Sequence, residues 1–220
     1  MKKSRLVFVP LLFVLASCET FTVGFTDDVH EAGVDHSTVS AYKEPSYPSY
    51  GGDQFTPSEN ENIAVITFSG IDDGLSNIQD IDKLNSFVTI DKEDFFQTIE
   101  NPLNVGTKEG EGLFIGADST YVDGEMTLVF KQNIKYVEIL ATPYYYVSHS
   151  WNDEKTQIDS DAGISVNGSP YIFISSSQNE DGSIKETNCR FLNYAQENKE
   201  KVTIKVGPKR ALIKKITLYY

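Results

Sequence analysis

Short runs rich in β-branched and aromatic residues recur from residue 63 to the end of the chain, and they constrain the fold more than any other feature. Met126, Leu128 and Phe130 alternate with neighbours that are polar or expected to be less buried, and Val202 and Ile204 show the same pattern further on. This period of two is typical of strands that have one face on a core. We therefore predict an all-β fold of two packed sheets, a β-sandwich. The expected strands cover residues 63–68, 87–90, 113–117, 125–130, 134–142, 164–166, 171–175, 189–194, 201–206 and 211–220.

Turn signals separate several of these runs. Asn167 and Gly168 form a pair that readily takes the positive φ angles of a type I′ turn, so they predict a hairpin. Further turns are expected at residues 180–182 and 122–124, where a glycine allows the bend. The apolar residues of the last run change phase near residues 214–215, which indicates a β-bulge there.

Helical signals are scarce in this chain. Asp91 is a candidate N-cap for one short helix over residues 92–99, which Pro102 would stop. Residues 70–86 are acidic and resemble a loop.

The N-terminus has the layout of a bacterial lipoprotein export signal. Basic residues precede the apolar run 6–15, which is too short to cross a bilayer as a helix, and Leu15, Ala16, Ser17 and Cys18 follow the lipobox pattern. The resemblance implies cleavage before Cys18 and a diacylglyceryl group on its sulfur, and two or more acyl chains anchor a protein stably. We therefore expect a signal peptide over residues 1–17 and a lipid-anchored protein of the cell envelope, outside the cytoplasm.

Charge limits the partners of this chain. The formal net charge is -13, and it becomes -16 without residues 1–17, which hold three basic residues and no acidic ones. Nucleic acid and anionic lipid headgroups are poor partners for such a protein. Residues 18–62 are acidic and rich in Pro, Gly, Ser and Tyr in their second half, with no sustained apolar period, so we expect them to form a flexible tether.

Residues 63–220 are enough for one domain with its own core. The chain has only two cysteines, Cys18 and Cys189. Once Cys18 is acylated, no intramolecular disulfide is available, and the domain must hold by burial and hydrogen bonding between strands.

Five segments occur in a familiar order, and they carry a family resemblance. The segments are 112–116, 124–130, 136–141, 164–168 and 209–218. Their order resembles a jelly-roll-like β-sandwich module of surface lipoproteins and secreted enzymes in low-GC Gram-positive bacteria. The resemblance implies a non-catalytic surface or binding module, and it supplies no ligand residues.

An aromatic and polar cluster follows the run 134–142 and is the candidate ligand-binding site. Flat aromatic faces beside hydrogen-bonding side chains suit a sugar, so we expect a glycan or another extracellular ligand such as a surface protein. In the alternative interpretation, the tyrosines alternate between core and solvent along a strand, and Trp151 closes one end of the sandwich. The candidate residues are Tyr144, Tyr145, Tyr146, His149, Trp151, Asn152 and Asp153.

Carboxylates make structural calcium a candidate cofactor. Acidic pairs occur at residues 72–73, 80–82 and 159–161, and calcium prefers six to eight oxygen ligands. The EF-hand pattern fails, because Ser177 and Asn188 occupy positions that require carboxylates. In the alternative interpretation these acids are simply solvated.

Signals for catalysis are weak, so the chain is predicted not to be an enzyme. It has no Gly-x-Ser-x-Gly and no His-Glu-x-x-His motif. Cys189 and His149 could pair as nucleophile and base, but an unpaired cysteine in a strand-like run is more often a small buried hydrophobe. Two alternatives stay open: a secreted hydrolase that uses carboxylates of the acidic loops, and a structural or adhesive envelope protein.

Lysines and one arginine gather in residues 199–215. They could meet an anionic polymer. The alternative is that they point outward from two adjacent strands, where lysines also discourage aggregation between sheets.

Overall fold

The computed structural model describes residues 49–50, 61–92, 94–117, 122–150, 153–193 and 199–220. The predictions on Cys18, Trp151 and Asn152, and most of the predicted tether, lie outside these residues. Nearly every described element is a strand, so the predicted all-β fold is confirmed. Among the described residues, no helix has the length and apolar character needed to cross a membrane.

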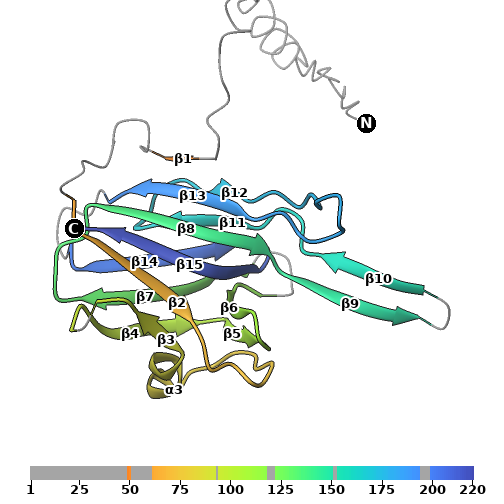
Figure 1. The fold of residues 1–220 in the computed structure, drawn as a ribbon, viewed down its shortest axis with the longest axis horizontal. Coiled ribbons are helices and arrows are strands. Elements are labelled where there is room, and N and C mark those ends of the chain that lie inside the picture. The colour runs from red at the N-terminus through yellow and green to blue at the C-terminus, as the bar shows by residue number, and fades with distance from the viewer. Residues whose placement is uncertain (1–48, 51–60, 93, 118–121, 151–152, 194–198) are drawn as a thin grey trace, which may run out of the picture. The chain divides into compact units, whose positions relative to one another are not determined.

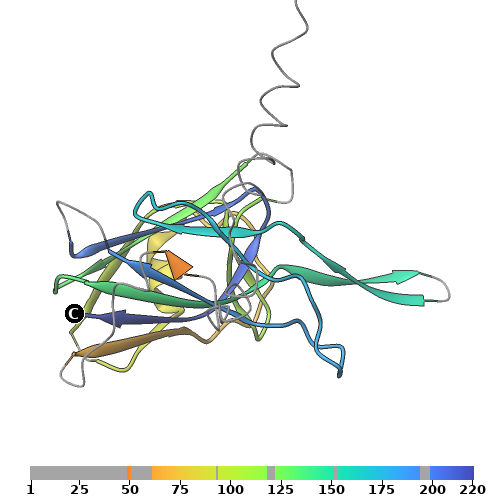
Figure 2. The same ribbon diagram turned by 90° about the horizontal axis from the view of Figure 1, so that it is seen from above.

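Two large sheets make up the sandwich (Figures 1 and 2). The first contains, in spatial order, β1 (Ser49–Tyr50), β13 (Thr187–Leu192), β8 (Tyr136–Pro143), β15 (Ala211–Tyr219), β2 (Ile63–Phe68) and β3 (Val88–Ile90). β6 (Gly112–Ile115) also pairs with β15, and β5 (Val105–Lys108) pairs with β6. The second sheet contains, in order, β12 (Ile172–Phe173), β11 (Gly163–Val166), β14 (Lys201–Gly207), β7 (Gly124–Phe130) and β4 (Phe96–Leu103).

Eight of these strands have the jelly-roll arrangement. They form the antiparallel orders β2-β15-β8-β13 and β7-β14-β11-β12 within the two sheets. When the eight strands are numbered along the chain, these orders are 1-8-3-6 and 2-7-4-5, which is the pattern of two Greek keys wound into a sandwich. The chain changes sheets at each connection between them except the hairpin from β11 to β12.

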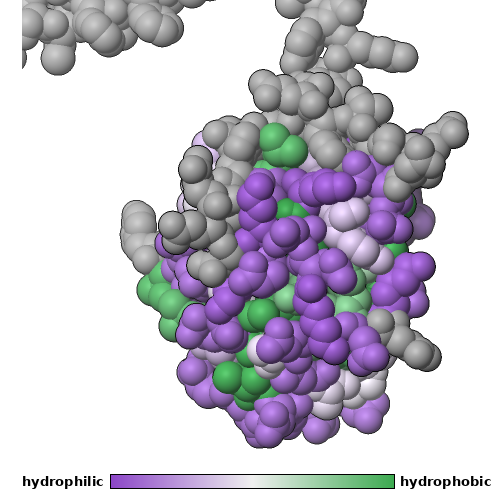
Figure 3. Space-filling view, turned by 90° about the vertical axis from the view of Figure 1, so that its left-hand side faces the viewer, coloured by the Kyte–Doolittle hydropathy of each residue, from purple (hydrophilic) through white to green (hydrophobic). Residues whose placement is uncertain are grey.

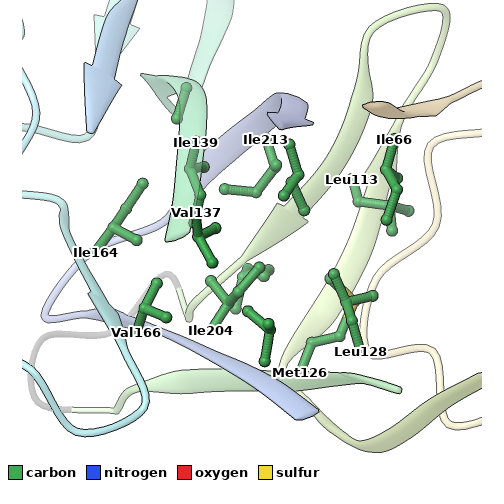
Figure 4. Close-up of a cluster of buried hydrophobic side chains, with 14 of the residues drawn as sticks. Ile66, Leu113, Met126, Leu128, Val137, Ile139, Ile164, Val166, Ile204 and Ile213 are labelled. Carbon is green, nitrogen blue, oxygen red and sulfur yellow. The ribbon is translucent and has the colours of Figure 1, made fainter. Parts of the chain in front are cut away.

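The core lies between the inner faces of the two sheets (Figure 4). Met126, Leu128 and Ile204 come from the second sheet and Val137 and Ile139 from the first, and each is 0% exposed. A fully buried aliphatic side chain contributes roughly 1.5–3 kcal/mol. The residues of β7 and β14 that were predicted to face the core therefore do face it.

The structure confirms two turns and the bulge. Asn167 and Gly168 have φ angles of 48° and 77°, and the Ser169 amide closes the turn by donating to the Val166 carbonyl at 3.0 Å. A second turn forms around Gly182, which has a φ of 82°. The register of β15 shifts between Ile213 and Lys215, and at this bulge the strand changes one neighbour from β6 to β2.

Gly124 was predicted to allow a bend at residues 122–124, but the structure places it in a strand. It begins β7, and a Cβ at this position would lie 2.7 Å from the Cα of Gly116. The glycine is therefore needed for the close approach of two backbones.

The predicted helix over residues 92–99 is wrong. Phe96 begins strand β4, and Phe95 and Phe96 pack their rings against Phe130 of the neighbouring strand, with centroids 5.3 and 6.1 Å apart. The described helix is α3 (Ile81–Ser86), inside the stretch 70–86 that was expected to be a loop. Asp80 caps it, because its Oδ1 accepts from the Lys83 amide at 3.1 Å.

A two-stranded arm projects from one end of the sandwich (Figures 1 and 2). It consists of β9 (Tyr145–Ser150) and β10 (Asp153–Ile158), which pair antiparallel with each other alone. The predicted ligand loop at 144–153 is therefore largely strand. The arm is an insertion in the connection between β8 and β11.

Candidate functional site

The base of the arm is fixed to the sandwich by an ion pair. Arg210 Nε donates to Asp159 Oδ2 at 2.6 Å, and the two side chains are only 12% and 9% exposed. The guanidinium also lies 4.0 Å from the centre of the Tyr144 ring. The Asp159 amide donates to the Tyr144 carbonyl, and the Tyr144 amide donates to the Arg210 carbonyl. This anchorage matters, because an isolated two-stranded hairpin is only marginally stable in water.

A second set of contacts joins the arm to strands β5 and β15. The Glu111 carboxylate accepts from the Tyr145 hydroxyl at 2.6 Å, from Lys108 Nζ at 2.7 Å and from Lys214 Nζ at 2.9 Å. Lys108 Nζ also lies 3.1 Å from the centre of the Tyr145 ring. We call Lys108, Glu111, Tyr145 and Lys214 the Glu111 cluster.

The environment of the Glu111 cluster shifts its pKa values. Burial works to raise the pKa of Glu111, but the hydrogen bonds from Lys108, Tyr145 and Lys214 outweigh burial and hold the pKa at about 2. Burial and the bond to Glu111 raise the pKa of Tyr145 to about 12. Burial lowers the pKa of Lys108, against the pull of Glu111. The cluster therefore contains an ionised Glu111 and a neutral Tyr145 at neutral pH.

A cleft of about 240 Å³ opens beside the Glu111 cluster. Its floor is the outer face of β8 and β15, and its walls are the arm and the loop of residues 174–186 that connects β12 to β13. Figure 2 shows that this loop and the arm extend from the same end of the sandwich. We call this hollow the arm cleft. It is lined by Thr142, Tyr145, Thr156, Gly182, Ser183, Ile184, Glu186 and Lys214.

The 174–186 loop is ordered by its own hydrogen bonds. Gln178 and Ile184 form an isolated antiparallel bridge. The Ser183 amide donates to Asp181 Oδ1 at 2.9 Å, and the Gly182 amide donates to the Asn179 carbonyl at 3.0 Å. This wall of the arm cleft is therefore pre-formed, which reduces the entropy that a ligand would have to offset.

Most of the residues that line the arm cleft have polar side chains. Hydroxyl groups of Thr142, Ser183 and Thr156 accompany one carboxylate and one ammonium group. Thr142 is 2% exposed, and its hydroxyl has no hydrogen-bond partner among the described residues. Hydroxyls donate and accept, a carboxylate accepts and an ammonium group donates. Such a lining can bind a ligand that carries several hydroxyl groups.

The predicted site residues divide between several environments. Tyr144 packs edge to face on Phe114 at 4.9 Å and, like Tyr145, is partly buried in contacts within the protein. Tyr146 is 47% exposed on the arm. His149 and Asp153 belong to β9 and β10, while Trp151 and Asn152 lie outside the described residues. Tyr145 is the one described member of the predicted set that lines the arm cleft.

Two of the candidate calcium ligands have other partners, and Cys189 is a buried core residue, as its strand-like surroundings predict. Asp80 caps α3, and Asp159 pairs with Arg210. In the part of the chain that the structure describes, no group of three or more His, Cys, Asp and Glu residues could hold a metal ion. Cys189 is 0% exposed in the core, and burial raises the pKa of its thiol to about 12.

The basic residues near the C-terminus behave as outward-facing strand residues. Lys201 pairs with Glu100 at 2.7 Å, and Lys205 pairs with Asp123 at 3.0 Å. Lys214 is the member of this group that lines the arm cleft.

Figure 3 shows the end of the sandwich opposite the arm. Where described side chains are visible, it is mostly hydrophilic, and apolar side chains lie in small separate patches. A wider hollow of about 450 Å³ is lined there by Asn133, Lys135 and their neighbours, and Asn193 and Lys199 on its rim flank residues 194–198, which lie outside the described residues. The arm cleft is therefore the site whose walls are defined.

Comparisons with known proteins give no match to a family model, a curated protein or a solved structure. A jelly-roll fold is compatible with many functions, so function has to come from the site. The arm cleft and the N-terminal sequence are the two features that bear on it.

Proposed function

We propose that this chain is a lipid-anchored protein of the cell envelope and that its jelly-roll head is a non-catalytic module that binds a glycan in the arm cleft. The observation that carries the proposal is a pre-formed hollow of about 240 Å³ with a lining rich in hydroxyl and charged groups. Binding sites are typically concave, with a few well-placed polar groups that fix orientation.

The size and chemistry of the arm cleft favour a sugar. The cleft is smaller than the pockets that enclose drug-sized molecules, so it suits one terminal or internal sugar unit of a longer chain. Sugar hydroxyls can donate to the Glu186 carboxylate and exchange hydrogen bonds with the Thr156 hydroxyl, and the side of the Tyr145 ring offers an apolar contact. The Glu111 cluster holds that ring in place.

The anchor part of the proposal comes from sequence. The lipobox at residues 15–18 predicts acylation of Cys18, and the acidic stretch that follows would separate the head from the membrane. A head that is tethered in this way meets glycans of its own envelope or of its surroundings. Nucleic acid is not a suitable partner for the net charge of -13.

An adhesive role is the second candidate, and the projecting arm favours it. Tyr146 and Val147 are 47% and 46% exposed on the arm, outside the lining of the arm cleft. Exposed aromatic and apolar groups on a projecting element suit contact with a surface protein.

A glycan array tests the glycan proposal. The full chain, purified in detergent, is compared with Thr156→Trp, which fills the arm cleft from the β10 side. Gln157→Trp is the matched control, because Gln157 is the next residue on the same strand and is absent from the lining. We expect a specific glycan signal from the parent chain and from Gln157→Trp and none from Thr156→Trp. No signal from the parent chain, or equal signals from all three, would contradict the proposal.

A further inference from the structure

The charges of the Glu111 cluster do not balance. Lys108 and Lys214 share a single carboxylate, that of Glu111, and the Tyr145 hydroxyl donates to the same carboxylate. The four side chains therefore carry one surplus positive charge. Lys108 lies against the Tyr145 ring and is absent from the lining of the arm cleft. Lys214 does line the arm cleft, so the surplus charge is presented there.

The Lys214 ammonium group has more N–H donors than its one carboxylate partner requires. An ammonium group has three N–H donors, and the structure gives Lys214 one carboxylate partner among the described residues, Glu111 at 2.9 Å. Its side chain is 22% exposed and lines the arm cleft. Thr142, which has the unpartnered hydroxyl, belongs to the same floor.

The positive charge of Lys214 is opposite in sign to the net charge of the whole protein. The net charge is -13, which repels anions at long range. At physiological ionic strength, however, charges are screened beyond roughly 8 Å, so a group seated in the arm cleft responds mainly to its immediate neighbours. Those neighbours are Lys214 on the floor and Glu186 on the loop wall. A ligand with an anion at one end and hydroxyls at the other complements both.

We infer that the glycan bound in the arm cleft carries an anionic group, a carboxylate or a sulfate ester, and that Lys214 recognises this group. The inference rests on the proposed glycan-binding function. The anionic group lies against the Lys214 ammonium on the floor, while the Glu186 carboxylate accepts hydrogen bonds from the sugar hydroxyls. Glu186 disfavours a second anion at the loop wall.

The test uses two matched pairs of polysaccharides and the full chain in detergent. Polygalacturonic acid is compared with its methyl ester, and dextran sulfate is compared with dextran, so the two pairs distinguish a carboxylate from a sulfate. The variant Lys214→Gln shortens the side chain only slightly and removes the charge. Lys215→Gln is the control, because it removes the same charge one residue away at an exposed position outside the lining.

We expect the acidic member of at least one pair to bind roughly tenfold more tightly than its neutral partner, as a charge-assisted hydrogen bond allows. Lys214→Gln should remove that preference, and Lys215→Gln should keep it. The melting temperature should be unchanged in Lys215→Gln and only slightly lower in Lys214→Gln, which loses its ion pair with Glu111. Equal binding of acidic and neutral members, or an equal loss in both variants, overturns the inference and leaves the proposed function standing. Absence of binding to every polysaccharide here and on the array overturns both.

Discussion

Replacing Glu111 with glutamine should destabilise the protein at neutral pH and much less in acid. Glutamine keeps an acceptor for the Tyr145 hydroxyl but removes the charge that faces Lys108 and Lys214. A pKa that is lowered from 4.5 to about 2 corresponds to roughly 3 kcal/mol of stabilisation for a fully buried group. The Glu111 side chain is 27% exposed. Water therefore screens part of this energy, and the expected loss at pH 7 is about 1 kcal/mol.

The pH dependence follows from the sign of that shift. The pKa of Glu111 is lower in the folded protein than in the unfolded chain, so its stabilisation is complete above pH 5 and declines as the pH falls towards about 2. More than half of the difference in unfolding free energy between the parent chain and Glu111→Gln should therefore be lost between pH 7 and pH 3.

Urea denaturation at several pH values measures this difference. Glu109→Gln is the control, because Glu109 is an exposed acid two residues away. We expect the control to differ from the parent chain by less than about 0.5 kcal/mol at each pH. A Glu111→Gln effect that stays constant from pH 7 to pH 3, or that equals the control, would refute the role assigned to the Glu111 cluster.

Three further predictions concern the core and the anchor. Gly124→Ala should cost more than about 3 kcal/mol in thermal or urea unfolding, because its Cβ would meet the Gly116 backbone, whereas Gly74→Ala, whose Cβ has no atom nearer than 4.0 Å, should cost little. The Cys189 thiol should react with iodoacetamide at pH 8 only after unfolding, because burial raises its pKa to about 12; rapid labelling of the native protein would disprove this. Cys18→Ala should move the protein from the membrane fraction to the soluble fraction and remove the acyl mass from the N-terminal peptide, and an unmodified Cys18 in the parent chain would disprove lipidation.

The sandwich could be predicted from sequence wherever a strand buries one face. In β14 the pattern of Val202 and Ile204 follows directly from one-sided burial. In β7, Met126 and Leu128 face the core, although Thr127 and Val129 on the other face are buried too. The Asn167 turn was predictable for a local reason too, because its positive φ is a property of the Asn-Gly pair.

Other elements give weaker or misleading signals. Phe95, just before β4, and Phe96 and Ile99 within it have a spacing that also fits a helix. Two register shifts in the pairing of β4 with β7 break the period of two. Helix α3 has six residues, too few turns to show a period, although its cap Asp80 is visible in the sequence. Both faces of the arm meet solvent over much of its length, so β9 and β10 lack apolar alternation.

The arm cleft could not be predicted, because its parts come together only in the folded chain. Thr142, Thr156, Ser183 and Lys214 belong to four different elements, and none of them has a distinctive local sequence. Tyr145 was singled out for its aromatic ring, but its main contacts are with Lys108 and Glu111 rather than with solvent.

Backbone NMR of the protein titrated with the tightest glycan from the array tests the central claim most directly. Binding in the arm cleft predicts shifts of the amide signals of Thr142, Thr156 and residues 182–186, on three elements that line one hollow. Signals at the far end of the sandwich, such as those of Asn133 and Lys135, should stay in place. Shifts confined to the outer part of the arm or to that far end would contradict the account.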